Sequence, residues 1–331
     1  MKQVILGRTG LSVSQLALGG LFVSKVGAQL EDGVKAIHRA VDLGINYIDT
    51  APGYQDSEEV VGKGLAGVQK PVIISTKLGG RPKPFDPRDK AGLRESVKES
   101  LRLLGREQID LLMIHEPDRP GQYDWWTNWD KVEGPVLEVM AELRQEGLVK
   151  FIGLGGTTAY EMAHIIRSGK FDVVLTAFNY SLLWREAAHE VIPAAREHNM
   201  GIIIGSPLQQ GALARCYHDA LSNPPGWLSR ARQAQLRALY QLVAECGLSL
   251  PELALRWVIS NPAIHTVLMG ARSAAEVEGN VAAVERGPLP SDLMAKLAVI
   301  GDMLPYRPFG EPFGIGWRMG NPHSYRGPGV A

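Results

Sequence analysis

Four side chains that could move a proton occur at similar places in the sequence, each just after a short apolar run. They are Asp49, Tyr54, Lys77 and His115, and the runs that precede them are residues 45–48, 72–75 and 109–114. In a parallel β/α barrel the carboxyl ends of the strands form one rim, and active sites lie there. A phenol beside an ammonium, a carboxylate and an imidazole can donate or remove a proton. We therefore predict that these four residues form a catalytic site at one end of a barrel.

Eight apolar runs are candidate strands, and amphipathic helical patterns separate them. The runs are residues 16–18, 45–48, 72–75, 109–114, 151–154, 173–176, 201–204 and 266–269. The helical stretches are 31–43, 57–65, 88–104, 131–146, 159–167, 185–198, 230–246, 250–260, 274–284 and 290–300. Strands that alternate with helices imply βαβ units, and eight of them predict an α/β fold, a closed (β/α)8 TIM barrel. The alternative is an open doubly wound sheet, which the lack of a G-x-G-x-x-G after the first run disfavours.

Several segments fall outside this alternation. Residues 4–13 resemble a β-hairpin around Thr9-Gly10, before the barrel. Segments 117–130 and 207–229 are irregular, as is a C-terminal tail over 302–331, and we take 1–331 as one barrel domain. The first segment and the tail are rich in aromatic residues: Tyr123, Trp125, Trp126, Trp129, Tyr306, Phe309, Phe313, Trp317 and Tyr325. We expect them to wall a pocket at the rim; alternatively they pin loops to the surface or contact a second subunit.

Composition limits the kinds of partner. The chain of 331 residues is 45% hydrophobic and 21% charged with a formal net charge of zero, so we expect no nucleic-acid partner. The first residues lack a signal-peptide pattern and no run of about 18 apolar residues occurs, so we expect no membrane span. Cys216 and Cys246 show no metal-ligand spacing. A reducing cytoplasm is the default expectation, with a disulfide as the alternative. The sequence does not indicate an oligomeric state.

The stretches around the four residues resemble the aldo-keto reductase family. The resemblance rests on residues 44–54 (GINYIDTAPGY) followed by Ser57-Glu58, on 75–77 (STK) and on 113–118 (MIHEPD). It implies hydride transfer between a nicotinamide cofactor and a carbonyl or alcohol. Tyr54 would be the acid or base, and the Lys77 charge would lower its pKa from about 10. Asp49 would hold Lys77, and His115 would position the substrate oxygen.

The resemblance also implies a cofactor site. Its members are Gly19, Gly20, Asp49, Gly155, Ser206, Pro207, Leu208, Gly270, Arg272, Ser273, Glu276 and Asn280. Residues 268–280 resemble the family's adenosine-phosphate segment, where a helix N-terminus favours anions, and Ser206-Pro-Leu208 would face the pyrophosphate. Glu276 stands where NADP-preferring members often carry arginine, and a carboxylate would repel a 2′-phosphate. Arg272 could offset this effect, so NADP and NAD both remain open.

The chain departs from the family pattern around the nicotinamide. Gly155-Gly156 and Ala177 replace a Ser-Asn pair and a glutamine, and Gly205 replaces a stacking aromatic residue. Asn179 or Tyr180 could supply the missing contacts. Similar departures occur in the branch that resembles aldose and galactose 1-dehydrogenases.

We therefore favour a sugar as the small-molecule substrate, oxidised at C1 to a lactone. The predicted substrate site is Leu21, Tyr54, His115, Glu116, Trp125 and Trp126, with Asp118 as a further partner for hydroxyl groups. The alternative is an NADPH-dependent reductase of aldehydes or ketones. A cofactor-binding regulatory subunit is a minor alternative. A metal-dependent barrel lyase or hydrolase would need a ligand cluster, and we expect no metal because His164, His189 and His198 fall in helical stretches.

Overall fold

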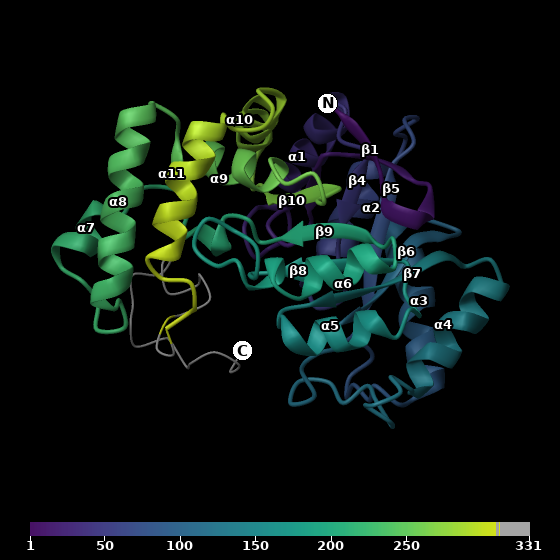
Figure 1. The fold of residues 1–331 in the computed structure, drawn as a ribbon. Helices are drawn as coiled ribbons and strands as arrows, with labels where there is room; N and C mark the ends of the chain where they lie inside the picture. The colour runs from purple at the N-terminus through teal and green to yellow at the C-terminus, as the bar shows by residue number, and fades with distance from the viewer. Residues whose placement is uncertain (309–310, 312–331) are drawn as a thin grey trace.

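The fold is a closed barrel of eight parallel strands surrounded by helices (Figure 1). The computed structural model describes residues 1–308 and residue 311. The strands are β3 (Leu16–Gly19), β4 (Tyr47–Asp49), β5 (Ile73–Leu78), β6 (Ile109–His115), β7 (Val149–Gly156), β8 (Val173–Ala177), β9 (Gly201–Gly205) and β10 (Thr266–Gly270). They follow one another around the barrel in chain order, and β10 pairs with β3 to close it. The predicted (β/α)8 barrel is confirmed, and each predicted apolar run overlaps one strand.

Eleven α-helices and three 3-10 turns occur in the described residues. The helices are α1 (Leu30–Asp42), α2 (Ser57–Leu65), α3 (Lys90–Leu104), α4 (Pro135–Gln145), α5 (Tyr160–Arg167), α6 (Val191–Glu197), α7 (His218–Ser222), α8 (Arg230–Cys246), α9 (Leu250–Ile259), α10 (Ala274–Glu285) and α11 (Ser291–Asp302). The 3-10 turns are η1 (Gly7–Thr9), η2 (Glu186–Ala188) and η3 (Gln209–Gly211). Within these described residues, none of the helices combines the length and the apolar character that crossing a membrane requires.

Three predicted segments differ from the structure. The helix expected over 185–198 is divided into η2 and α6, because Pro193 has no N–H and fits only in the first turn of a helix. The helix expected from 131 begins at Pro135, since Asn128 and Glu133 first form a β-bridge. The segment 207–229 is less irregular than predicted, since it contains η3 and α7.

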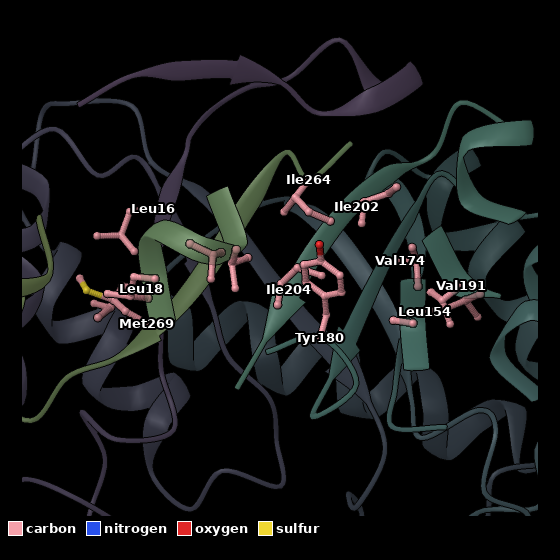
Figure 2. Packing of buried hydrophobic residues seen from close by; sticks show 14 of the residues in the cluster. Leu16, Leu18, Leu154, Val174, Tyr180, Val191, Ile202, Ile204, Ile264 and Met269 are labelled. Atoms are coloured by element: carbon pink, nitrogen blue, oxygen red, sulfur yellow. The ribbon is translucent and has the colours of Figure 1, made fainter. Parts of the chain in front are cut away.

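Alternate residues of each strand belong to two hydrophobic layers. In β9, Ile202 and Ile204 pack between the barrel and the helices, whereas Ile203 belongs to the cluster inside the barrel. Figure 2 shows Val174 of the outer layer near Leu154 and near Val191 of α6, and Ile204 beside Tyr180. Burial of each such side chain contributes about 1.5–3 kcal/mol, so the barrel is a rigid support for its rim.

The N-terminal hairpin lies at the amino end of the barrel, opposite the rim. Its strands β1 (Gln3–Ile5) and β2 (Ser12–Ser14) pair antiparallel, as predicted. Leu6 and Val13 of this hairpin are fully buried in the interior cluster. A Cβ atom on Gly201, at the start of β9, would lie 2.6 Å from Leu6 Cγ. The hairpin therefore fills the amino end of the barrel.

The rim at the carboxyl end has two unlike halves. Strands β4, β5 and β6 carry the ionisable residues, whereas β7, β9, β10 and β3 end in glycine and β8 ends in alanine. Neighbouring side chains approach these glycines closely. A Cβ atom on Gly270 would lie 2.6 Å from the Phe22 ring, and one on Gly156 would lie 2.6 Å from Asp118 Oδ1. Side chains from the loops after β3 and β6 therefore fill the space that a side chain at Gly270 or Gly156 would need.

The end of the described chain is attached to the loop after β8. Helices α8 and α11 pack side by side, to the left of the barrel in Figure 1. Arg232 of α8 forms a buried two-pronged ion pair with Glu311, with Nε–Oε1 at 2.6 Å and Nη2–Oε2 at 2.9 Å. Arg307 donates a hydrogen bond to the carbonyl of Phe178 and lies over the Trp184 ring.

Most of the aromatic residues of the C-terminal tail lie outside the residues that the structure describes. Tyr306 is 68% exposed. Phe309, Phe313, Trp317 and Tyr325 lie outside the described residues, so their predicted place at the pocket stays a prediction.

Candidate active site

Lys77 and Asp49 form a buried ion pair at the ends of neighbouring strands. Lys77 Nζ lies 2.9 Å from Asp49 Oδ1, 2.7 Å from Oδ2 and 2.9 Å from the carbonyl of Thr50. Ser75 also donates a hydrogen bond to Asp49 Oδ1 at 2.6 Å. Burial alone would lower the pKa of Lys77, but the Asp49 carboxylate opposes this effect, and the pKa of Lys77 lies above its ordinary value. Lys77 is therefore a fixed positive charge.

Tyr54 and His115 face each other beside this ion pair. Lys77 Nζ lies 4.8 Å from the centre of the Tyr54 ring. The rings of Tyr54 and His115 meet edge to face, with centres 5.6 Å apart. The structure thus brings together the four predicted catalytic residues.

The pKa of Tyr54 differs from the expectation drawn from the sequence. The Lys77 charge lowers it, but burial of the phenol outweighs this effect, and Asp49 and Glu116 also raise it. The pKa of Tyr54 therefore lies above 10 in the protein alone. A positive charge such as an oxidised nicotinamide ring nearby would favour the phenolate.

His115 is a neutral imidazole over the usual pH range. Burial, then the charges of Lys77 and Arg119, lower its pKa from 6.5 to about 3. Its buried Nδ1 makes no hydrogen bond within the described part of the chain. A neutral imidazole can donate a hydrogen bond to a substrate oxygen without adding a charge.

The loop after β6 holds its tryptophans inward. Trp125 is fully buried and Trp126 is 7% exposed. Their indole N–H groups donate to the carbonyls of His115 at 3.0 Å and Pro117 at 2.7 Å. Both therefore support the backbone that carries His115, and their predicted contact with substrate stays a prediction. Tyr123 packs on Trp125 with ring centres 5.8 Å apart and would also meet a Cβ atom on Gly79 or Gly80.

Two residues proposed as substitutes for the family's nicotinamide contacts are engaged elsewhere. Asn179 Nδ2 donates to the carbonyl of Thr157 at 2.8 Å, and Tyr180 OH accepts from Asn261 at 2.8 Å. Both side chains are buried. The proposal that they replace the missing contacts is therefore not supported by their geometry. A glycine is needed at position 156 because the Asp118 carboxylate occupies the space that a side chain would take there.

A groove of about 790 Å³ continues from the glycine half of the rim toward α10. It gathers seven predicted cofactor residues: Ser206, Pro207, Leu208, Gly270, Arg272, Glu276 and Asn280. Ser273 does not line it and instead caps α10, since its hydroxyl accepts from the N–H of Glu276 at 3.3 Å. Gly19, Gly20, Asp49 and Gly155 lie at strand ends on the rim, outside this groove, and Leu21 follows β3.

The loop after β9 forms one wall of the groove, with Ser206, Pro207, Leu208, Gln210 and Gly211. Ser206, Gln209 and Gln210 have left-handed backbones, with φ of 53°, 50° and 48°. Left-handed residues in a turn can direct backbone N–H groups into a concavity that suits phosphate oxygens. In this loop the N–H groups of Gln209 and Gly211 are bonded to the carbonyls of Ser206 and Leu208, at 2.9 and 3.0 Å. Tyr217 OH holds the loop by donating to the carbonyl of Gly211 at 2.7 Å. Together with the N-terminus of α10, this loop fits the pyrophosphate of a dinucleotide.

Arg272 and Glu276 form an ion pair in the groove. Arg272 Nε lies 2.9 Å from Glu276 Oε1, and the Arg272 backbone N–H donates to Oε2 at 2.8 Å. Burial opposes ionisation of Glu276, but the hydrogen bonds and charge of Arg272 lower its pKa below the ordinary value. The cation at this end of the groove is thus already paired with a carboxylate.

Sequence reasoning missed several residues of the site. Phe22, Gln210 and Arg215 line the groove. Phe22 closely follows the glycine that ends β3, and this place in the sequence could have marked it as a residue of the rim. Thr157 binds the Glu116 carboxylate at 2.6 Å, and no local pattern marked this contact because the two residues come from different strands.

The part of the chain that the structure describes can be compared with the expectations for metal ligands and cysteines. No group of three or more His, Cys, Asp or Glu side chains placed to hold a metal ion occurs among residues 1–308 and 311. Cys216 and Cys246 are free thiols, so the alternative of a disulfide between them is wrong.

Comparisons with known proteins place this geometry in context. The model of the aldo/keto reductase family matches residues 15–302. The chain is 30% identical to L-galactose dehydrogenase of Arabidopsis thaliana, over 84% of this chain and 86% of that protein. It is 28% identical to the NADH-specific methylglyoxal reductase of Escherichia coli, over 86% of this chain and 94% of that protein. The solved structure of aldo-keto reductase AKR11C1 from Bacillus halodurans in its holo form matches with a TM-score of 0.74 at 27% identity, over 92% and 98% of the two chains.

Proposed function

The chain belongs to the aldo-keto reductase family and is an NAD(P)-dependent oxidoreductase, and we propose that its substrate is an aldose, oxidised at C1 to a lactone. The observation that carries this proposal is a carboxylate, Glu116, directly after His115 on the rim, since a sugar offers hydroxyl donors to such a group. The similarity to a relative named as a sugar dehydrogenase supports it.

The four clustered residues would perform the proton transfer. Tyr54 would remove the proton of the C1 hydroxyl as the C1–H bond gives up a hydride and the C=O bond forms. The bound oxidised cofactor supplies the hydride acceptor. Lys77 would stabilise the phenolate by its charge, and Asp49 would keep Lys77 ionised and in place. Neutral His115 would orient the substrate oxygen by a hydrogen bond.

We propose NAD rather than NADP as the preferred cofactor. The Arg272–Glu276 pair supports this choice, because a 2′-phosphate would meet the Glu276 carboxylate and would compete with it for the guanidinium. The similarity to a reductase whose name specifies NADH points the same way.

The second candidate is a reductase of aldehydes or ketones, which the similarity to a methylglyoxal reductase favours. Absorbance at the reduced-nicotinamide band separates the two. An increase in this absorbance with aldoses and NAD would support the dehydrogenase. A decrease with aldehydes and reduced cofactor, without any increase with aldoses, would support the reductase.

The variant Tyr54→Phe tests whether Tyr54 is the acid or base of the reaction. It should lower turnover by roughly 10²–10⁴-fold, the usual contribution of a positioned acid or base. The affinity for the cofactor, measured by the quenching of tryptophan fluorescence, should stay nearly unchanged. Normal turnover in this variant would remove Tyr54 from the proposed mechanism, and cofactor binding without turnover in the parent protein would favour a regulatory role.

A further inference from the structure

Glu116 has an unusual backbone for its residue type. It follows His115 at the end of β6 with φ of 48°, in the left-handed region. A side chain other than glycine or asparagine is disfavoured there, and glycine would relieve the strain. A glutamate kept in such a conformation beside the reacting groups indicates that its side chain is used.

The carboxylate of Glu116 is held by one oxygen. Oε2 accepts a hydrogen bond from Thr157 Oγ1 at 2.6 Å and lies 3.6 Å from Arg119 Nη1. Within the described residues no hydrogen bond reaches Oε1. The side chain is 12% exposed. One oxygen is therefore fixed while the other can still accept a hydrogen bond.

The surroundings make this carboxylate easy to protonate. Burial raises the pKa of Glu116 from 4.5 to about 7, and the charge of Asp118 adds to this effect. Thr157, just after β7, and Arg119, in the same loop as Glu116, lower the pKa of Glu116. From the neighbouring strand ends, the Lys77 ammonium is paired with Asp49, Tyr54 interacts electrostatically with Glu116, and His115 is neutral.

We propose that Glu116 recognises a hydroxyl group on the carbon next to the reacting carbonyl carbon, by accepting its hydrogen bond through Oε1. An ionised carboxylate is only an acceptor, so it suits a hydroxyl donor and offers nothing to a plain alkyl chain. An aldose carries such a hydroxyl at C2. This inference rests on the proposed oxidoreductase function but holds for either direction of the reaction.

The recognition depends on pH in a defined direction. Below about pH 7 Glu116 is mostly protonated, and its hydrogen bond with the substrate is one between neutral groups. Above this pH the bond is assisted by charge and is stronger. The preference for a hydroxylated substrate should therefore rise as the pH rises through 7.

The test compares 2-hydroxypropanal with propanal, reduced with the preferred reduced cofactor between about pH 5.5 and pH 8.5. The ratio of their kcat/KM values isolates Glu116, because the titration of Tyr54 affects both substrates alike. In the wild-type enzyme the ratio should increase about fivefold to tenfold across this range, the difference between a neutral and a charge-assisted hydrogen bond. In Glu116→Gln it should be low and independent of pH.

The variant Thr157→Val tests the same group from its partner. The Thr157 hydrogen bond lowers the pKa of Glu116, so its loss should move the midpoint of the ratio to higher pH without abolishing the change. Cofactor affinity and thermal unfolding of both variants check that the fold is intact.

Two failures are distinguishable. If the wild-type enzyme reduces both aldehydes with a ratio that is flat, or that Glu116→Gln leaves unchanged, the inference is wrong while the oxidoreductase function stands. If neither aldehyde nor any aldose is turned over, the proposed function fails. In that case the affinities of the enzyme–cofactor complex for 1,2-propanediol and 1-propanol are measured by calorimetric titration. If the preference for the diol were the same in the wild type and in Glu116→Gln, the inference would be overturned.

Discussion

Arg272 and Glu276 satisfy each other in the groove before any cofactor enters it. The pair is partly exposed, so its net contribution to stability is small. Its effect on a ligand is larger, because the carboxylate repels an added phosphate and holds the guanidinium that would bind it.

At this scale we expect Glu276→Gln to shift cofactor preference toward NADP. Loss of the carboxylate frees Arg272 and removes the repulsion, so the ratio of kcat/KM for NADP over NAD should rise about tenfold, as for one charge-assisted hydrogen bond. Glu278→Gln on the same helix is the control, since Glu278 pairs with Arg39 at 2.7 Å and does not line the groove. An unchanged ratio in Glu276→Gln would contradict the assignment of this end of the groove.

Glu116 also links the active site to stability. Between pH 4.5 and about 7 the folded protein keeps a proton that the unfolded chain has lost, so the free energy of unfolding falls as pH rises, by roughly 3 kcal/mol. Glu116→Gln cannot ionise, so its stability relative to wild type should grow from about pH 5 to about pH 8. Urea unfolding at three pH values measures this; parallel curves would show that the pKa of Glu116 is not raised.

Among the elements, the strands that position the site were predictable and the contacts between their ends were not. The runs before Asp49, Lys77 and His115 are short, apolar and separated by helical patterns, which is sufficient for a barrel and for a common rim. The pairing of Glu116 with Thr157 depends on side chains 41 residues apart. The raised pKa of Tyr54 depends on how deeply the phenol is buried, which periodicity does not report.

In the loop after β6, too, the side-chain contacts were not predictable from the sequence. Trp126 was predicted to contact substrate, but its N–H bonds the carbonyl of Pro117. Trp126→Phe should therefore lower the free energy of unfolding by about 1 kcal/mol or more through the lost hydrogen bond. Trp129→Phe is the matched control, because Trp129 is 37% exposed in the same loop. A raised KM for substrate with unchanged stability in Trp126→Phe would support the original prediction instead.

For the whole molecule, the Arg232–Glu311 pair joins α8 to the end of the described chain across 79 positions. Both side chains are essentially unexposed. Sequence patterns gave no sign of this contact, since a lone glutamate in an irregular tail has no periodic partner.

Breaking this pair should be costly in a specific way. Glu311→Leu leaves a guanidinium buried without its carboxylate and should destabilise the protein by roughly 3–5 kcal/mol. Adding Arg232→Met should recover most of this loss, because an apolar pair can replace a buried ion pair. Glu59→Leu, which breaks the exposed Lys63–Glu59 pair, should change stability by less than about 1 kcal/mol. Urea unfolding of the wild type and these three variants measures the difference. If the double variant were as unstable as Glu311→Leu, a mainly electrostatic cause would be ruled out.

The glycines that end β3, β7, β9 and β10 also bear on how this enzyme could change over generations. A glycine codon is one base away from several others, so single mutations can place new side chains around half of the reaction chamber. The cost differs by site: a Cβ atom on Gly155 would meet Lys77 Cε at 3.3 Å, whereas one on Gly270 would meet the Phe22 ring at 2.6 Å. Gly155, the residue before the end of β7, thus has the most room for an added Cβ atom, but the side chain that such an atom meets is the reacting Lys77.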